Sequence, residues 1–350
     1  MTLARDAIES VTAVLTGSKV TRVSRLVLLG YRAVQEASYW LLPIAPGLDL
    51  WGVDRQLRTV DFRQRLFFNE RRACGAARRR ILVCSDPAIA MGERNEPGQQ
   101  ILKACGLKLR EDPTLFLTGD SHHYERRAIG ASQHVIAGCG GAFVHGTRVH
   151  KYPPGRTPAI AYPDARTSRR LAASVPWQVV AGTPGILPHV SCALLAYLQV
   201  GAFRANAATG WAVTAAFAAV AVLAMFATMS LKCRRRWAAA SVAIAFGIAL
   251  ALLPLGIGWL VSLVTGRLAT ELLTAGIMAF AGPLLIGHYL LTLVVTGLEP
   301  WSAYSALGHP GFKHFVRLCV HADGRVEGWT IGKDDPLAPG APVLIDRFEW

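Results

Sequence analysis

The sequence is poor in charge for its size. Asp, Glu, Lys and Arg make up 17% of its 350 residues, whereas hydrophobic residues make up 52%. Soluble domains carry about 25% charged residues, so this balance favours a membrane protein with soluble parts attached. At this length the chain has room for two or three domains.

A nucleic-acid-binding signature is also missing. The formal net charge of +14 would suit a nucleic acid, but the arginines are thinly spread and no basic motif with interleaved aromatic residues occurs. Some of the arginines flank apolar segments, as expected beside anionic lipid headgroups. We therefore expect a lipid bilayer as a partner and no nucleic acid.

The cysteine pattern argues against two further classes of protein. The seven cysteines include no Cys-x-x-Cys pair, their number is odd, and Cys192 and Cys233 lie in or beside apolar segments. A disulfide framework and a structural zinc site are therefore not expected, and a reducing compartment is. We also expect no signal peptide, because the first apolar cluster, Leu26 to Gly30, is short and starts late.

Long windows without charge dominate the second half of the chain. The windows without Asp, Glu, Lys or Arg cover residues 171–203, 205–231, 237–266 and 272–298. A spanning helix needs about 20 largely apolar residues, so we predict a transmembrane domain over 177–299. Its predicted spans cover 186–203, 209–231, 238–263 and 272–297. Pro176, Pro184 and Pro188 crowd the start of the first window, so a re-entrant or interfacial helix is the alternative for its span.

The placement of basic residues predicts the orientation of these spans. The strongest basic cluster between spans lies at 232–236, which the positive-inside rule places in the cytoplasm. Arg166, Arg169 and Arg170 flank the start of the first span. We therefore predict four spans in a bacterial inner membrane with both termini cytoplasmic, whereas three spans would place the first soluble part outside.

The first soluble part, residues 1–176, has the pattern of an α/β domain. Short apolar runs at 80–85, 114–118 and 133–137 predict buried strands, and weak periodicity over 97–110 predicts a helix. The stretch 152–170, rich in Pro and Arg, predicts a linker toward the membrane.

The last part, residues 300–350, predicts a small cytoplasmic β-element close to the membrane. Apolar residues alternate with polar ones over Val316–Val320, Asp323-Gly324 follows, and apolar residues return at Val326 and Ile331. This pattern is typical of a β-hairpin.

One segment combines strand character with metal-ligating side chains. The apolar run over 115–117 stops at Gly119, which permits a turn, and Asp120 and His122 follow. A carboxylate and an imidazole at a strand end can reach a common divalent ion of the zinc, manganese or iron kind. Arg126 follows closely, and a guanidinium near a metal suits a phosphate oxyanion.

Each of these features also has a structural alternative. Asp120 could cap a helix whose histidines are solvated. The glycines at 138–141 could form only a tight turn, and His145 could be a surface residue. His288, inside the fourth predicted span, is more often a residue hydrogen-bonded between helices than a functional group.

The order of the motifs resembles a bacterial family of calcineurin-like metallophosphoesterases fused to a multi-span membrane domain. The family's Gly-Asp-x-His-His-Tyr-x-Arg element is matched by Gly119–Arg126, and its Gly-rich Ala-Phe-Leu-His segment by Gly138–His145. Further similar segments are Ser38–Trp40, Leu50–Leu57, Tyr162–Asp164 and Phe312–Leu318. The resemblance covers nearly the whole chain and corresponds to the C-terminal two thirds of the family.

The resemblance implies a β-sandwich with flanking helices and two divalent metal ions, Mn, Fe or Zn. The ions polarise a phosphoester and activate a bridging water. Because Gly119–His122 is similar to the family's Gly-His-x-His motif, the implied metal ligands are Asp120 and His122. The implied catalytic residues are His123 and Arg126. The implied substrate or loop supports are Gly119, Tyr124, Gly140, Gly141 and His145.

The chain departs from the family in its first half. The motifs Asp-x-His, Gly-Asp-x-x-Asp and Gly-Asn-His do not occur before residue 119. Two ligands cannot hold two metals, so the chain holds about half of such a site. The first hypothesis is a phosphoesterase whose N-terminal half is missing from the sequence or lies on a separate chain. The second is a catalytically inactive, membrane-anchored binding or scaffold protein, and the third is a small transporter-like protein.

Overall fold

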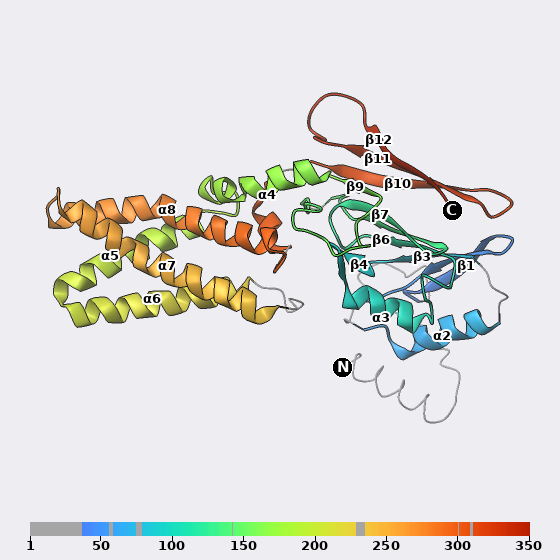
Figure 1. Cartoon of the computed structure of the whole chain (residues 1–350), viewed down its shortest axis with the longest axis horizontal. Coiled ribbons are helices and arrows are strands. Elements are labelled where there is room, and N and C mark those ends of the chain that lie inside the picture. Colours follow the sequence, from blue (N-terminus) through green and yellow to red (C-terminus); the bar gives the residue numbers. More distant parts are fainter. Residues whose placement is uncertain are drawn as a thin grey trace, which may run out of the picture.

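A computed structural model describes residues 37–55, 59–74, 79–141, 143–228, 235–299, 301–308 and 311–350. An α/β part lies at one end of the long axis and a bundle of helices at the other (Figure 1). The apolar cluster at Leu26 to Gly30 and the basic residues 232–234 lie outside the described residues.

The α/β part is built on a mixed sheet of seven strands in the order β1-β2-β3-β6-β8-β7-β9. The strands are β1 Trp40–Ala45, β2 Leu48–Gly52, β3 Arg79–Cys84, β6 Thr114–Thr118, β7 Tyr124–Ile129, β8 Ser132–Ala137 and β9 Ile160–Tyr162. β2, β3, β6 and β8 are parallel to their neighbours in this series. The three strands predicted from apolar runs are confirmed as β3, β6 and β8.

Two helices cover one face of this sheet. α2 (Phe62–Ala73) begins at Asp61, whose carboxylate accepts hydrogen bonds from the backbone N–H groups of Arg63 and Gln64. α3 (Glu96–Ala104) ends before the predicted limit at residue 110. The buried residues that join helices and sheet are Trp51, Phe68, Leu82, Ile101, Leu102, Cys105 and Phe116. A short hairpin of β4 (Ile89–Ala90) and β5 (Glu93–Arg94) precedes α3.

The opposite face is covered by a second, three-stranded sheet. It consists of β10 (Lys313–Val320), β11 (Val326–Lys333) and β12 (Val343–Glu349) in that order. The predicted hairpin is confirmed as β10–β11, whereas β12 was not predicted. Buried residues of both sheets share one core, so the C-terminal part is a layer of the α/β domain (Figure 1). Two sheets with flanking helices are present, but the second sheet comes from residues 300–350, which were expected to form a separate element rather than part of the sandwich.

The predicted linker is wrong. Residues 152–170 contain β9 and the beginning of α4 (Ala165–Val180), which starts at Asp164. The carboxylate of Asp164 accepts a hydrogen bond from the Thr167 N–H, and this cap outweighs the Pro-rich composition before it. The predicted domain boundary at 176/177 falls inside α4.

Four helices form the bundle: α5 (Leu187–Ala205), α6 (Ala207–Ala227), α7 (Arg236–Ser262) and α8 (Arg267–Val295). Among the described residues, α6, α7 and α8 are long and apolar enough to cross a membrane. The predicted first span is not supported by this measure, because α5, although 19 residues long, is made less apolar by His189, Gln199 and Arg204. α5 nevertheless packs along α8, as does α4.

Candidate functional site

The candidate site lies at the edge of the sheet where the parallel strands β3, β6 and β8 end. The backbone N–H groups of Gly119 and Asp120, just after β6, donate to the Ser85 carbonyl, just after β3. Gly138, just after β8, lies so close that a Cβ there would be 2.0 Å from the Gly119 oxygen. The loops after the three strands are therefore locked together. Such an edge is where open α/β sheets hold ligands.

His122 and His145 form a stacked pair at this edge. Their ring centroids are 4.4 Å apart and the ring planes differ by 1°. Nδ1 of His145 accepts from the His122 N–H at 3.0 Å, and the His145 N–H donates to the His122 carbonyl at 2.8 Å. Burial lowers the pKa of His145 to about 3, so its ring is a neutral imidazole at neutral pH. The structure thus joins two residues that the sequence separates by 23 positions.

This pair corrects one structural alternative. His145 is 5% exposed, so it is not the surface residue that its sequence context allowed. The Nδ1 atom of His122 is buried and has no hydrogen-bond partner. A buried polar atom without a hydrogen-bond partner is unusual in a folded protein, and such an atom is often bonded to water, an ion or a ligand.

Asp120 is exposed at the same edge. The helix-cap alternative is wrong, because strand β7, not a helix, follows Asp120. The described residues nevertheless contain no group of three or more His, Cys, Asp or Glu side chains placed to hold a metal ion. Asp120 and His122 are therefore at most part of a ligand set.

His123 lies inside the domain rather than at the open edge. It is fully buried, and neither ring nitrogen has a hydrogen-bond partner. Its Nε2 lies 3.7 Å from Oε2 of Glu125, and Oε1 of Glu125 accepts from Nε of Arg127 at 3.0 Å. Burial is the main cause that lowers the pKa of His123 and raises that of Glu125. For His123 to be catalytic as predicted, its neutral imidazole would have to act from this buried position beside Glu125 and Arg127.

Tyr124 and Arg126 lie on the face of strand β7 opposite to Glu125 and Arg127, and both form hydrogen bonds there. Nε and Nη2 of Arg126 donate to the two carboxylate oxygens of Asp346 at 2.6 and 3.1 Å, and the Tyr124 hydroxyl donates to the same carboxylate at 2.7 Å. Asp346 lies on β12, so this network joins the two sheets. In this structure Arg126 is therefore paired with a carboxylate, and Tyr124 is buried between the sheets. Neither side chain is free to bind a phosphate.

The glycines predicted as loop supports lie beside open space. A Cβ at Gly119, Gly140 or Gly141 would meet no atom within 4 Å. Phe143 follows them, with 38% of its surface exposed and its ring 4.8 Å from that of His122. The loop between β8 and β9 therefore leaves an open, apolar approach to the histidine pair.

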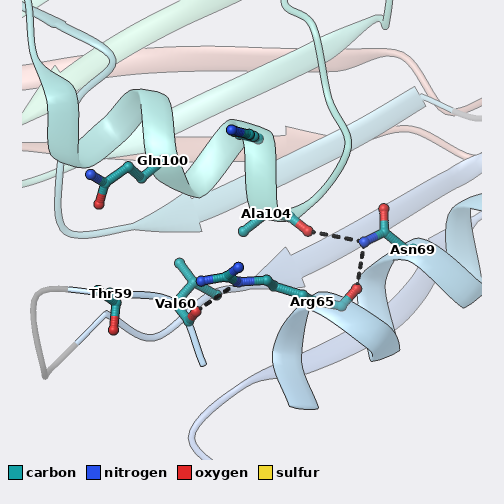
Figure 2. A pocket seen from close by; sticks show the side chains of 7 residues that line it. Thr59, Val60, Arg65, Asn69, Gln100 and Ala104 are labelled. Carbon is teal, nitrogen blue, oxygen red and sulfur yellow. Dashed lines mark hydrogen bonds between the residues drawn. The ribbon is translucent and has the colours of Figure 1, made fainter. Parts of the chain in front are cut away.

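A groove that no sequence motif predicted lies on the helix-covered face, between α2 and α3 (Figure 2). It is lined by Thr59, Val60, Arg65, Asn69, Gln100, Lys103 and Ala104. Its polar groups largely satisfy one another: Arg65 donates to the Val60 carbonyl, and Asn69 donates to the carbonyls of Arg65 and Ala104. We assign no chemistry to this groove.

Comparison with models of protein families, with curated proteins and with solved structures found no match to this chain. The family resemblance therefore depends on the motifs quoted above and enters only as a proposal below.

Proposed function

We propose that this protein is a membrane-anchored, metal-dependent phosphoester hydrolase whose reaction takes place at the carboxyl edge of the seven-stranded sheet. The observation that carries this proposal is the His122–His145 pair, held at that edge by reciprocal hydrogen bonds beside the exposed Asp120. Imidazole and carboxylate groups are ligands of zinc, manganese and iron. The unpartnered Nδ1 of His122 supports a role that the protein's own groups do not fill.

This chain would supply only part of the catalytic site. Asp120 and His122 would ligate a divalent ion, and the ion would polarise the phosphoester and activate water. His145 would hold His122 in place through the hydrogen bond from the His122 N–H. Further ligands would have to come from outside the described residues or from a separate chain.

We further propose that the bundle crosses the membrane four times, with α5 as the first crossing. The strands before α5 and the strands after α8 share one core, so both lie on the same side of any membrane that the bundle crosses. An odd number of crossings would separate them. Because three of the helices are long and apolar enough to span, α5 completes the even number.

The polar side chain of Gln199 is compatible with α5 inside a membrane. Gln199 is fully buried, and its Nε2 donates to the Thr214 hydroxyl at 2.7 Å and to the Ala251 carbonyl at 2.8 Å. These contacts join α5 to α6 and α7. Polar side chains that bond across helices are a common means of association within a bilayer.

Exposed tryptophans lie where a membrane interface would be. Trp211 and Trp259, 57% and 64% exposed, lie near the end of the bundle at which α5 meets α6. Trp237, 90% exposed, lies at the opposite end, at the start of α7. Tryptophan is enriched at both interfaces of a bilayer. Between Trp237 and Trp259 a helix rises about 33 Å, close to the thickness of the hydrocarbon core.

The topology can be tested with a membrane-impermeant maleimide on intact cells. Cys74 and Cys319 are exposed thiols on the two soluble parts, and we expect neither to be labelled until the membrane is permeabilised. Asn206, exposed between α5 and α6, should be labelled from outside in the variant Asn206→Cys. Labelling of only one native thiol on intact cells would contradict four crossings.

The catalytic proposal is tested by manganese-dependent hydrolysis of bis(4-nitrophenyl) phosphate by the full chain in detergent. We expect His122→Ala to lower the rate roughly 10- to 100-fold or more. His321→Ala, in the turn after β10, should leave the rate unchanged. Equal rates for wild type and His122→Ala would contradict the proposal.

A second candidate is a catalytically inactive binding or scaffold domain held at the membrane. It is favoured by one observation: no set of three metal-ligating side chains is assembled within the described ranges. A folded wild-type protein with no manganese-dependent hydrolysis would favour this candidate over the first.

A further inference from the structure

The edge that carries the histidine pair faces the membrane bundle. The ring of His145 packs against that of Trp301, with centroids 5.2 Å apart, and Trp301 follows shortly after the end of α8. A Cβ at Gly297, two residues after α8, would lie 2.8 Å from the ring of His150. The β8–β9 loop therefore touches the chain just where α8 would leave the bilayer.

Exposed cations lie on the elements at this end of the bundle. Arg148 and Lys151 lie in the β8–β9 loop, on either side of His150, and both are exposed. Arg169 and Arg170 are exposed on the first half of α4, which packs along α8. Arg235 is exposed at the start of α7, at the same end of the bundle. Cations in this position attract anionic lipid headgroups.

The open approach to the site is also suited to a lipid. Phe143 is 38% exposed, its ring lies 5.2 Å from that of His145, and the glycines before it add no side-chain bulk. An exposed aromatic ring beside a glycine-rich loop can enter the headgroup region while the backbone stays close to the ligand. A site for a freely soluble ester would need neither the ring nor the nearby bilayer.

We propose that the phosphoester bound at this edge belongs to an anionic membrane lipid, whose headgroup enters from the bilayer past the exposed ring of Phe143 in the β8–β9 loop. This inference rests on the proposed function for the reaction that follows. The docking of the lipid itself does not depend on the reaction and can be measured without it.

The docking is tested by photo-crosslinking. The full chain is reconstituted in vesicles of phosphatidylcholine and phosphatidylglycerol with benzoylphenylalanine in place of Phe143. We expect phosphatidylglycerol adducts at position 143, and none when the same group replaces Phe62 on α2, a phenylalanine that is more exposed than Phe143. Absence of adducts at 143, or equal adducts at both positions, would overturn the inference.

Charge dependence gives a second reading of the same experiment. At a limiting mole fraction of phosphatidylglycerol, Lys151→Gln should lower the adduct yield at 143 roughly five-fold, because one cation near the surface is removed. Lys108→Gln, which removes an exposed cation on the far part of the domain, should leave the yield unchanged. Equal losses for both variants would contradict a local headgroup site.

Hydrolysis separates the inference from the function on which it rests. With manganese present, we expect the rate on phosphatidylglycerol to follow its mole fraction in the bilayer at constant bulk concentration. Hydrolysis of only the soluble bis(4-nitrophenyl) phosphate would overturn the lipid as substrate and leave the proposed function in place. Hydrolysis of neither ester would contradict the proposed function, and the adducts at 143 would still decide the docking.

Discussion

The two faces of strand β7 differ in how fully their polar side chains are hydrogen-bonded. On the face toward the second sheet, Tyr124 and Arg126 share the carboxylate of Asp346. On the other face, buried atoms of Glu125 and Arg127 have no partner, and neither ring nitrogen of the adjacent His123 has one. A satisfied network is what a structural junction needs. Unpartnered buried polar atoms instead are typical of places where an ordered water or a ligand is bonded.

The largest effect is expected on the satisfied face. Asp346→Ala would leave a guanidinium without its carboxylate in a site where Asp346 is 7% exposed. Removing one partner of a buried pair costs about 3–5 kcal/mol, so we expect the free energy of unfolding to fall by that amount in urea denaturation. Asp335→Ala, which removes an exposed carboxylate bonded to a turn N–H, should cost about 1 kcal/mol or less. Equal losses would mean that the junction is not structural.

On the other face, we expect the stability of the fold to fall in acid because of His134, which pairs with Arg127 across β7 and β8. Burial lowers the pKa of His134 to about 3, and its Nε2 accepts from the Ala88 N–H. The unfolded chain then binds a proton that the folded chain excludes. The neutral ring contributes its full stability above pH 6.5, and this contribution is lost as pH falls from 6.5 toward 3.

The measurement is the free energy of unfolding as a function of pH. His134→Leu removes one titrating group, so the slope between pH 3 and 6.5 should fall by up to about 1.4 kcal/mol per pH unit. The variant should also be less stable at neutral pH, because the Ala88 N–H loses its acceptor. Parallel slopes in wild type and variant would show that His134 takes up a proton within the fold.

A smaller effect is expected in the bundle, where Gln199 has both a satisfied and an unsatisfied end. Its Nε2 is bonded, while its buried Oε1 is not. Gln199→Leu removes the bonds but also the orphan oxygen, so we expect a loss of only about 1 kcal/mol in unfolding from detergent. A loss above about 3 kcal/mol would indicate that Gln199 does more than join helices.

The smallest effect is expected at an exposed pair. Lys108 bonds Glu111 at 2.9 Å, and both side chains are more than half exposed. Lys108→Ala should change the free energy of unfolding by at most about 0.5 kcal/mol. A fall in the free energy of unfolding as large as that of Asp346→Ala would mean that buried and exposed ion pairs contribute equally to stability.

The elements that the sequence predicted well are those with a strong local pattern. The apolar runs of β3, β6 and β8 and the alternation in β10 and β11 are sufficient to define strands. The apolar helices α6 to α8 are defined in the same way by length and composition. α5 was predicted as a helix, but its own composition does not mark it as a span, and its place in the bundle depends on contacts with α8.

The candidate site was predicted only in part, for a similar reason. Gly119, Asp120 and His122 form a local motif, and they do lie at a sheet edge. The stacking of His145 on His122 and the engagement of Arg126 by Asp346 link residues 23 and 220 positions apart. Contacts over such separations follow from the sheet order, which a single sequence does not reveal.

The most direct test of the account is manganese binding to the full chain in detergent, measured by calorimetry. We predict that the wild type binds the ion and that His122→Ala weakens binding at least about ten-fold, while His321→Ala binds as the wild type does. A folded wild type that takes up no manganese, or a His122→Ala variant that binds it equally well, would contradict the assignment of a metal site to this edge of the sheet.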